Sequence, residues 1–436
     1  MAERAKDEPP TSAERARNER VEAKRIVLGV AGGIAAYKAC ELLRRFTEGG
    51  HDVTVVPTAN ALEFVGATTW AALSGNPVHT GVFTDAELVP HVRLGQQADL
   101  VVVAPATADL LARAATGRAD DLLTNVLLTA RCPVLMAPAM HTEMWLHPAT
   151  TANVATLRER GVVVLDPASG RLTGADTGPG RLPDAVDIHA VAGSLLEDPD
   201  TVTAAAERDL QGVRLVVATG GTREHLDPVR FLGNSSSGLM GLSVARAAAL
   251  RGAEVTVVAA HVEHPLPSGV TVRKIVSTGD LDEAMTELAP EADVVVMAVA
   301  AADFTPTEVS EGKIKKADDS TGLTLDLVQT PDVLKHISHL PDRDPDQVIV
   351  GFAAETAGDQ DTLLELGRAK LARKGCDLLV LNDVSAGAVF GAEDNHVLLL
   401  GATAGGGAQL VAEHNGSKPT VAHRILDAVR DRRAAN

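Results

Sequence analysis

The sequence predicts an α/β protein with two doubly wound, mainly parallel sheets of the Rossmann-like type. Short apolar runs recur at helix-sized intervals, as expected of parallel strands that are buried on both faces. The series lapses once, near the middle of the 436-residue chain, and then restarts. Each series opens with a strand that ends in Gly-Gly. We therefore expect two successive domains, each with its own sheet.

The first domain is expected at residues 25–192. Its predicted strands are Arg25–Val30, Asp52–Val56, Asp99–Ala104, Pro133–Ala137 and Val162–Leu165. Between the first two, apolar residues at helical spacing predict an amphipathic helix, which Gly49 and Gly50 end. Residues 1–24 are polar and carry no apolar segment, so we expect a disordered extension rather than a signal peptide.

The second domain is expected at residues 213–436, after a polar, helix-prone linker at 193–212. Its predicted strands are Leu215–Ala218, Val255–Val258, Val294–Ala298, Val348–Gly351, Leu378–Leu381 and Val397–Leu400. The two halves echo each other, but all units of this fold share one physical pattern, so we infer no duplication. Each domain should bind its ligand at the carboxyl ends of its parallel strands.

Composition limits the classes of partner. The formal net charge is -18, from 40 basic and 58 acidic residues, and this field repels nucleic acids and anionic lipid. Aromatic residues make up 2% of the chain, too few for platforms that stack bases. No apolar run is long enough for a membrane span. The three cysteines are far apart in sequence, which indicates free thiols in a reducing compartment. We expect a cytoplasmic protein with no nucleic-acid or membrane partner.

Nicotinamide cofactors are disfavoured in both halves. The second strand of a dinucleotide site should end near an acid that binds the ribose, but here these strands end in Val-Val-Pro-Thr and Ala-Ala-His. No Walker A pattern is present. The Gly-Gly turns can still bring backbone N–H groups near a phosphate.

Several motifs carry a resemblance to known families. GGIAAYK, the His91 segment, APATAD, APAMHTEMW and GADTGPGR resemble the flavin-dependent cysteine decarboxylases. GGTREHLDPVRFLGNSSSG, AAADF, KIKK, GFAAET and AKLARKGCDLLVLNDVS resemble the phosphopantothenate–cysteine ligases. In this order, the chain resembles the bifunctional bacterial enzymes of coenzyme A synthesis.

The ligase resemblance implies that CTP activates 4′-phosphopantothenate as an acyl-cytidylate, from which cysteine displaces CMP with the help of Mg²⁺. It places Arg230 and Asn234 on the substrate or acyl intermediate, and Lys313 on the triphosphate. The nucleotide contacts that it implies are Met297, Ala298, Val299, Asp303, Lys313, Pro331, Asp332, Val333, Leu334, Phe352, Lys370 and Lys374. The ligands of the metal stay open.

The decarboxylase resemblance implies that FMN oxidises the thiol of phosphopantothenoylcysteine, so that carbon dioxide can leave and 4′-phosphopantetheine is formed. It makes His91 an active-site residue and places His141 where the family has an Asn that contacts the substrate carboxylate. The implied FMN contacts are Gly32, Gly33, Thr58, Pro105, Ala106 and Thr107. Gly174 stands where many members carry a Cys that protonates the final intermediate.

Two alternatives stay open, and only the first rests on these departures from the decarboxylase motifs. The first is an active ligase fused to a non-catalytic, flavin-binding regulatory module. The second is an unrelated two-domain oxidoreductase that uses a nicotinamide cofactor. The resemblance also implies that the first half trimerises and the second dimerises, which predicts a homo-oligomer larger than a dimer.

Overall fold

The computed structural model describes residues 23–79, 81, 90–172, 177–315, 322–357, 359–383, 394–403 and 405–435. The extension expected at 1–24 lies outside these residues, apart from its last two. The described chain divides into two compact units. The first ends at His189, and the second begins at Ala190 and also includes Asp166–Ser169. The predicted linker falls in the second unit and is largely helical, in α9 (Ala185–Glu197) and α10 (Pro199–Glu207).

The first unit contains a five-stranded parallel sheet in the order β2-β1-β3-β4-β5. Its strands are β1 (Arg25–Val30), β2 (Asp52–Pro57), β3 (Leu100–Ala106), β4 (Val134–Pro138) and β5 (Val163–Val164). All five lie within a few residues of the predicted runs, and the predicted fold class is confirmed. A further two-stranded sheet, of β6 (Ala168–Arg171) and β7 (Thr177–Arg181), was not predicted.

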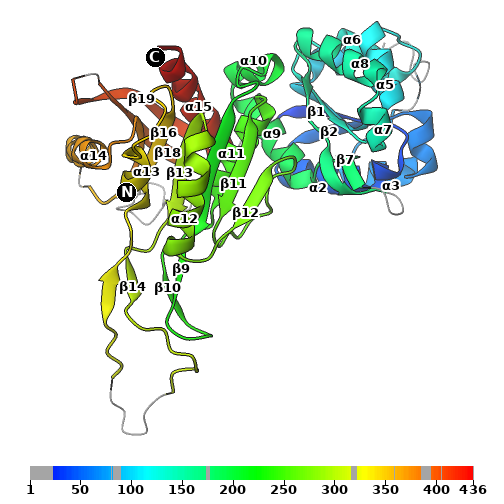
Figure 1. Cartoon of the computed structure of the whole chain (residues 1–436). Coiled ribbons are helices and arrows are strands. Elements are labelled where there is room, and N and C mark those ends of the chain that lie inside the picture. Colours follow the sequence, from blue (N-terminus) through cyan, green and yellow to red (C-terminus); the bar gives the residue numbers. More distant parts are fainter. Residues whose placement is uncertain are drawn as a thin grey trace, which may run out of the picture. The chain divides into compact units, whose positions relative to one another are not determined.

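Helices cover both faces of this sheet (Figure 1). Leu110, Leu123 and Leu157, from α5, α6 and α8, are buried in one cluster with Val27 and Val101 of the sheet. The amphipathic helix predicted after β1 is confirmed, because Leu42, Leu43 and Phe46 of α2 are buried. The helices up to α8 are η1 (Ile34–Lys38), α2 (Ala39–Glu48), η2 (Ala59–Glu63), α3 (Ala67–Ser74), α4 (Pro90–Gln97), α5 (Ala108–Thr116), α6 (Leu122–Thr129), α7 (Thr142–Trp145) and α8 (Pro148–Glu159).

The second unit contains an eight-stranded sheet in the order β12-β11-β8-β13-β16-β17-β18-β19. The strands are β8 (Arg214–Gly221), β11 (Glu254–Ala259), β12 (Thr271–Lys274), β13 (Val294–Ala300), β16 (Val348–Glu355), β17 (Leu378–Asp383), β18 (Asp394–Ala402) and β19 (Ala408–Ser417). The strands from β12 to β17 are parallel, whereas β18 and β19 pair antiparallel. The edge strands β12 and β19 were not predicted, because they lie half in solvent and lack a continuous apolar run.

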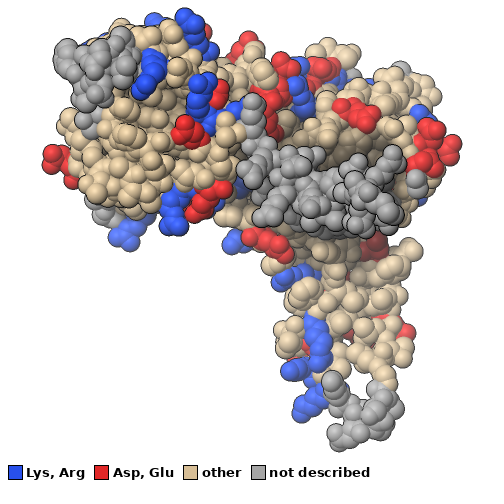
Figure 2. Space-filling model, turned by 180° about the vertical axis from the view of Figure 1, so that it is seen from behind, with Lys and Arg blue, Asp and Glu red and all other residues tan. Residues whose placement is uncertain are grey.

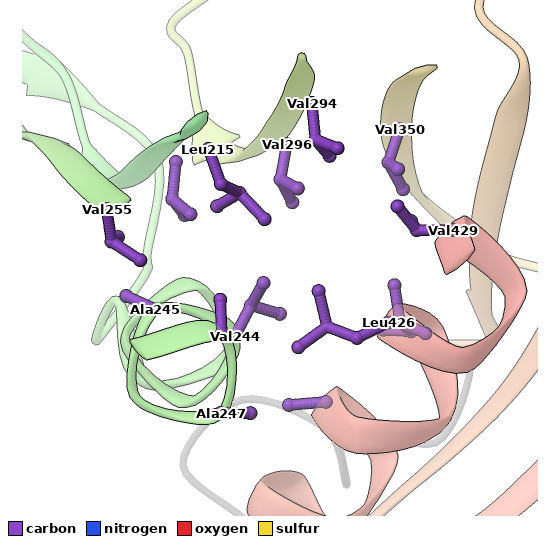
Figure 3. Packing of buried hydrophobic residues seen from close by; sticks show 14 of the residues in the cluster. Leu215, Val244, Ala245, Ala247, Val255, Val294, Val296, Val350, Leu426 and Val429 are labelled. Carbon is purple, nitrogen blue, oxygen red and sulfur yellow. The ribbon is translucent and has the colours of Figure 1, made fainter. Parts of the chain in front are cut away.

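Two helical layers sandwich this sheet. On one face, Val296 and Val350 of the sheet pack with Val244 of α11 (Leu239–Leu250) and with Leu426 and Val429 of α15 (Lys418–Ala435) (Figure 3). The opposite face packs against α12 (Thr278–Leu288), η4 (Ala289–Glu291), α13 (Val333–Ser338) and α14 (Gln360–Lys374). Such a two-sided core is what continuously apolar strands require.

A buried arginine fixes the C-terminal helix α15. Arg251, at the end of α11, is 0% exposed. Its Nε donates to Asp209 at 2.7 Å, and one terminal nitrogen donates to Asp427 at 2.8 Å and to the carbonyl of His423 at 3.0 Å. Removing one partner of such a buried ion pair typically costs about 3–5 kcal/mol. The network therefore sets the position of α15 against α11.

Two short hairpins project from the carboxyl edge of the second sheet (Figure 1). One pairs β9 (Arg223–His225) with β10 (Phe231–Gly233), and the other pairs β14 (Phe304–Pro306) with β15 (Leu327–Gln329). The insertion between β8 and α11 thus contains a regular hairpin. Basic side chains line one side of the part of the molecule that projects with these two hairpins (Figure 2). Among the described residues, no helix is long and apolar enough to span a bilayer.

Candidate functional sites at the carboxyl edges of the two sheets

A cavity of about 1020 Å³ lies in the first unit, where β1, β3 and β4 end. Five of the six predicted FMN contacts line it, namely Gly32, Gly33, Thr58, Pro105 and Thr107. The sixth, Ala106, is 0% exposed and lies outside the lining. The parallel strands thus bring together residues that are far apart in sequence.

Close backbone approach explains the first glycine of the Gly-Gly turn. A Cβ atom on Gly32 would lie 2.3 Å from the Cβ and 2.8 Å from the carbonyl carbon of Asn60, so a larger residue would displace the η2 segment. Thr58 and Thr107 cap η2 and α5, because each hydroxyl accepts a backbone N–H of the following turn. The cavity wall is therefore built from well-anchored turns.

The lining suits a flat, partly apolar ligand with an anionic tail. Its apolar side chains include Ile34, Met140, Met144, Leu172 and Leu182, and its cationic ones are Lys38, Arg113, Arg118, Arg171 and Arg181. Pockets of this size with apolar walls and a few convergent polar groups are typical of cofactor sites.

Carboxylates already balance part of this positive charge. Arg113 contacts Asp109 at 3.0 Å, Asp120 at 3.0 Å and Asp121 at 2.7 Å. Burial alone would raise the pKa of the Asp121 carboxyl, but Arg113 and Thr124 outweigh it and lower that pKa. Asp121 therefore stays ionised at neutral pH and holds Arg113 in place.

The structure separates the two predicted histidines. His141 follows β4 and lines the cavity. His91 lies on α4, outside the lining, and its Nδ1 is buried without a hydrogen-bond partner among the described residues. The Thr129 hydroxyl donates to the His91 carbonyl at 2.9 Å. Gly174, which replaces the family's Cys, lies outside the described residues.

In the second unit, Asp227 organises the inserted segment. Its side chain is 0% exposed, and one carboxylate oxygen accepts the backbone N–H groups of Val229 and Arg230, both at 2.7 Å. The other oxygen accepts the Arg230 guanidinium at 2.8 Å and the N–H of Ile314 at 3.0 Å. Arg230 also donates to the Ile314 carbonyl at 2.8 Å. A single carboxylate thus ties Arg230 to the segment that carries Lys313.

The pKa of Asp227 follows from these contacts. Burial would raise the pKa of its carboxyl, but the three backbone donors and Arg230 outweigh that effect and lower it. Asp227 was not among the predicted site residues. The motif HLDPVR could have indicated its role, since an Asp side chain in a turn often accepts backbone N–H groups of that turn.

Asn234 directly follows β10, and its side chain reaches the residue after β13. Its amide donates to the carbonyl of Ala301 at 2.8 Å. The neighbouring Ala302 N–H donates to the buried Thr222 hydroxyl at 2.8 Å, and the Ala302 carbonyl accepts the Thr330 hydroxyl at 2.6 Å. These bonds join the inserted segment to the loop that begins with Ala301 and ends in Asp303.

A second cavity, of about 300 Å³, lies between β13, β16 and the start of α11. Ala298 and Phe352 line it, together with Ser235, Ser236, Ser237 and Gly238. Asn382, Asn395 and Lys418 also line it, and we did not predict them individually. Asn382 stands inside the resemblance motif LVLNDVS, whereas nothing in the local sequence marks Asn395 or Lys418.

The other predicted nucleotide contacts lie elsewhere. Met297 and Val299 of β13 point to the face of α12, α13 and α14, because alternate residues of a strand share one face. Val333 and Leu334 of α13 pack in the same cluster, in which Met297 and Val333 are buried. Any ligand contact by Met297 or Val333 would therefore use backbone atoms. Asp303, Lys313 and Pro331 are exposed and do not line the 300 Å³ cavity.

Lys370 and Lys374 lie one turn apart on α14, and each contacts a different carboxylate. Lys370 contacts Glu355 and Lys374 contacts Asp332, both at 2.7 Å. Burial would raise the pKa of the Asp332 carboxyl, but Lys374 and the N–H of Lys335 outweigh it and lower that pKa. Among the described residues, no group of three or more His, Cys, Asp or Glu side chains forms a metal site.

Comparisons with known proteins cover both units. The family model described as Flavoprotein matches residues 14–196, and the one described as DNA/pantothenate metabolism flavoprotein C-terminal domain matches residues 210–432. The coenzyme A biosynthesis bifunctional protein CoaBC of Mycolicibacterium smegmatis is 57% identical over 413 residues, which cover 93% of this chain and 97% of that protein. The protein of the same name from Vibrio cholerae is 41% identical over 379 residues, or 86% of this chain and 91% of that protein.

Solved structures resemble each half of the chain. A crystal structure of the C-terminal domain of CoaBC is 30% identical and covers 52% of this chain and 100% of that chain, with a TM-score of 0.42. A mutant PPC decarboxylase complexed with pantothenoylaminoethenethiol is 28% identical and covers 41% of this chain and 100% of that chain, with a TM-score of 0.38.

We predict that Asp227→Asn loosens the segment around Ile314. Both carboxylate oxygens accept hydrogen bonds, so an amide can replace only one of them and must turn its NH₂ group toward the other pair of donors. Bonds to a charged group contribute about 1.5–3 kcal/mol, so amide exchange at Ile314 should rise about 10- to 100-fold in hydrogen–deuterium exchange. Asp361→Asn, at an exposed position of α14, is the matched control. Unchanged exchange at Ile314 would show that Asp227 is no anchor.

Proposed function

The chain belongs to the family of bifunctional coenzyme A biosynthesis proteins, and we propose that it makes 4′-phosphopantetheine in two steps. CTP drives the ligation of 4′-phosphopantothenate to cysteine in the second unit, and FMN-dependent decarboxylation of phosphopantothenoylcysteine follows in the first. The observation that supports this most is that each unit has its own cavity at the carboxyl edge of its parallel sheet, lined by motif residues.

The bifunctional assignment is favoured over a regulatory flavin module. The relatives that carry the bifunctional name match nearly the whole chain, including the first unit. The nicotinamide alternative is excluded by the same matches, since the first unit belongs to a flavoprotein family.

The first cavity fits FMN in size and in chemistry. A Cβ on Gly32 would collide with Asn60, so glycine at this position lets the turn pack closely against the η2 segment of the cavity wall. When bound, FMN supplies the oxidation of the substrate thiol that makes loss of carbon dioxide possible. In this proposal, Gly33, Thr58 and Thr107 hold the cofactor, and His141 donates a hydrogen bond to the substrate carboxylate.

In the second unit, Asp227 sets the geometry of the proposed ligase site. It aligns Arg230 with the segment of Lys313, so that both cations can meet the phosphate groups of the bound substrates. Asn234 holds the loop after β13, where the acyl group would lie. Lys370 and Lys374 would exchange Glu355 and Asp332 for phosphate oxygens when CTP binds. Mg²⁺ would offset part of the triphosphate charge, and we assign no protein ligand to it.

Product analysis tests this function. With 4′-phosphopantothenate, cysteine, Mg²⁺ and CTP, we expect CMP, pyrophosphate, carbon dioxide and 4′-phosphopantetheine by mass spectrometry. Lys313→Gln should slow CMP formation about 10²–10³-fold, the usual cost of removing one preorganised donor at developing charge. Decarboxylation of supplied phosphopantothenoylcysteine should stay unchanged, because it belongs to the other unit. Lys274→Gln, at an exposed position of β12, is the matched control.

Two outcomes would contradict the proposal. ATP supporting ligation as well as CTP would refute the cytidine assignment. If Lys313→Gln forms CMP at the rate of the control, Lys313 is an ordinary exposed side chain without a role in the reaction. Isolated surface charges contribute only about 0–1 kcal/mol to stability.

Flavin retention gives a separate prediction. Gly32→Ala should lose most of the FMN absorbance of the purified protein, because the new Cβ would collide with Asn60. Gly66→Ala is the matched control, since its φ is -67° and nothing lies within 4 Å of the added Cβ. Flavin content can be measured by absorbance after denaturation. Equal flavin content in the two variants would contradict the proposal that FMN binds in this cavity.

The position of His91 supports a homo-oligomer, and the family resemblance implies that it is larger than a dimer. If His91 acts on the substrate, it must reach a cavity of another copy, since it does not line its own. Apolar side chains near the cavity are also exposed, such as Ile34 at 71% and Tyr37 at 59%, and a partner would cover them. We expect light scattering to give a mass of more than two chains of 45.3 kDa. A mass of one or two chains would contradict this assembly.

A further inference from the structure

The loop between β13 and β14 contains a buried residue whose backbone is held by side chains. Ala302 is 5% exposed and belongs to no strand or helix. Its N–H donates to the Thr222 hydroxyl at 2.8 Å, and its carbonyl accepts the Thr330 hydroxyl at 2.6 Å. The Thr278 hydroxyl donates to the same carbonyl at 3.4 Å. Three threonines from three segments thus satisfy the backbone groups of Ala302, which has no strand partner.

The hydroxyls of Thr222 and Thr278 form a closed ring of hydrogen bonds with Ala302. The two hydroxyl oxygens lie 3.0 Å apart. A threonine hydroxyl has a single hydrogen, so Thr278, which donates to the Ala302 carbonyl, must accept from Thr222. Thr222 in turn accepts the N–H of Ala302, which completes the ring. Each donor in the ring has an acceptor, so the ring orients both hydroxyls and both backbone groups of Ala302.

Thr278 is itself anchored, because it is the first residue of α12. It is 0% exposed, and its N–H donates at 2.8 Å to Glu224 of β9, which is 5% exposed. A capping box between Ser277 and Asp280 orders the same turn of the helix. The Thr278 hydroxyl therefore projects from a fixed helix end, and it can hold a less regular segment in place.

The residues on either side of Ala302 belong to the proposed ligase site. The Ala301 carbonyl accepts the Asn234 amide at 2.8 Å, and Asn234 is the residue expected to contact the substrate. Asp303, an expected nucleotide contact, follows and is exposed. Thr278 does not line the 300 Å³ cavity. A shift of the Ala302 backbone would move both of its neighbours, so Thr278 can affect the site without touching a ligand there.

We propose that Thr278 is a positioning residue of the ligase reaction, which acts through Ala302 on the loop that ends in Asp303. This inference rests on the proposed ligase function. An apolar side chain of the same shape would fill the same space, but only a hydroxyl can accept from Thr222 and donate to the Ala302 carbonyl. Reacting groups that are displaced by about 1 Å can lose about 10²-fold in rate. The ring thus holds the loop in the geometry that the reaction needs.

Steady-state kinetics of CMP formation by the full-length, FMN-loaded protein test the proposal. Thr278→Val removes the hydroxyl but nearly keeps the shape, and it should lower kcat about 10- to 100-fold. The KM for CTP should change much less, because the cations of α14 stay in place. Thr278→Ser keeps the hydroxyl and should restore kcat to within a few-fold of the wild type. Thr286→Val, at an exposed position of the same helix, is the matched control.

Hydrogen–deuterium exchange gives a readout other than activity. In Thr278→Val the Thr222 hydroxyl loses its acceptor, so the ring opens and exchange of the Ala302 amide should rise about 10-fold. In Thr278→Ser and Thr286→Val this exchange should stay at the wild-type rate. A slower reaction in Thr278→Val without faster exchange at Ala302 would contradict an effect through this loop.

The other outcomes are separable. If Thr278→Val keeps the kcat of the control, the inference is wrong, and a lower melting temperature would then assign Thr278 a structural role alone. Equal loss of kcat in Thr278→Ser also overturns it, because the hydroxyl would not be the cause. Wild-type protein that forms no CMP overturns the ligase function and this inference with it. Thr278→Ala, which keeps the N–H bond to Glu224, gives the same test if the valine variant does not fold.

Discussion

Parallel pairing of the strands is the constraint on which both sites depend. Because β1, β3 and β4 run in one direction, the turns after them meet at a single edge, and the same holds for β8, β13 and β16. Segments that are far apart in sequence therefore face one cavity, as Ser236, Phe352 and Lys418 do. The apolar runs that make the strands also decide where the chemistry can lie.

Within that frame, buried polar groups place the reactive segments. Asp227 holds the inserted hairpin and the Lys313 segment with one carboxylate, and Thr222 and Thr330 hold the loop after β13. Each of these groups would cost free energy if it were left without a partner. Each of these hydrogen bonds joins two segments, so loss of one bond disturbs both. The bonds therefore fix the positions of irregular segments, as catalysis requires.

The cations of both sites are largely neutralised by carboxylates of the chain. Arg113 contacts three aspartates, and Lys370 and Lys374 each contact one acid. Such pairing fits a protein with a net charge of -18, whose field repels nucleic acids. In the proposed function, phosphate groups would replace these carboxylates, which would favour ligands that bring several charges at once.

The sequence by itself determined the two sheets, because continuous apolar runs specify buried parallel strands, and its motifs located the turns at their ends. Only the tertiary structure decided which side chains meet there. It directs Met297 into the core and Ala298 into a cavity, since strand neighbours point to opposite faces. It pairs Lys374 with Asp332. It also places His91 outside the lining of the first cavity, and it places Lys418 and Ser236 in the lining of the second. Local patterns encode local structure, whereas contacts between distant segments depend on how the elements pack.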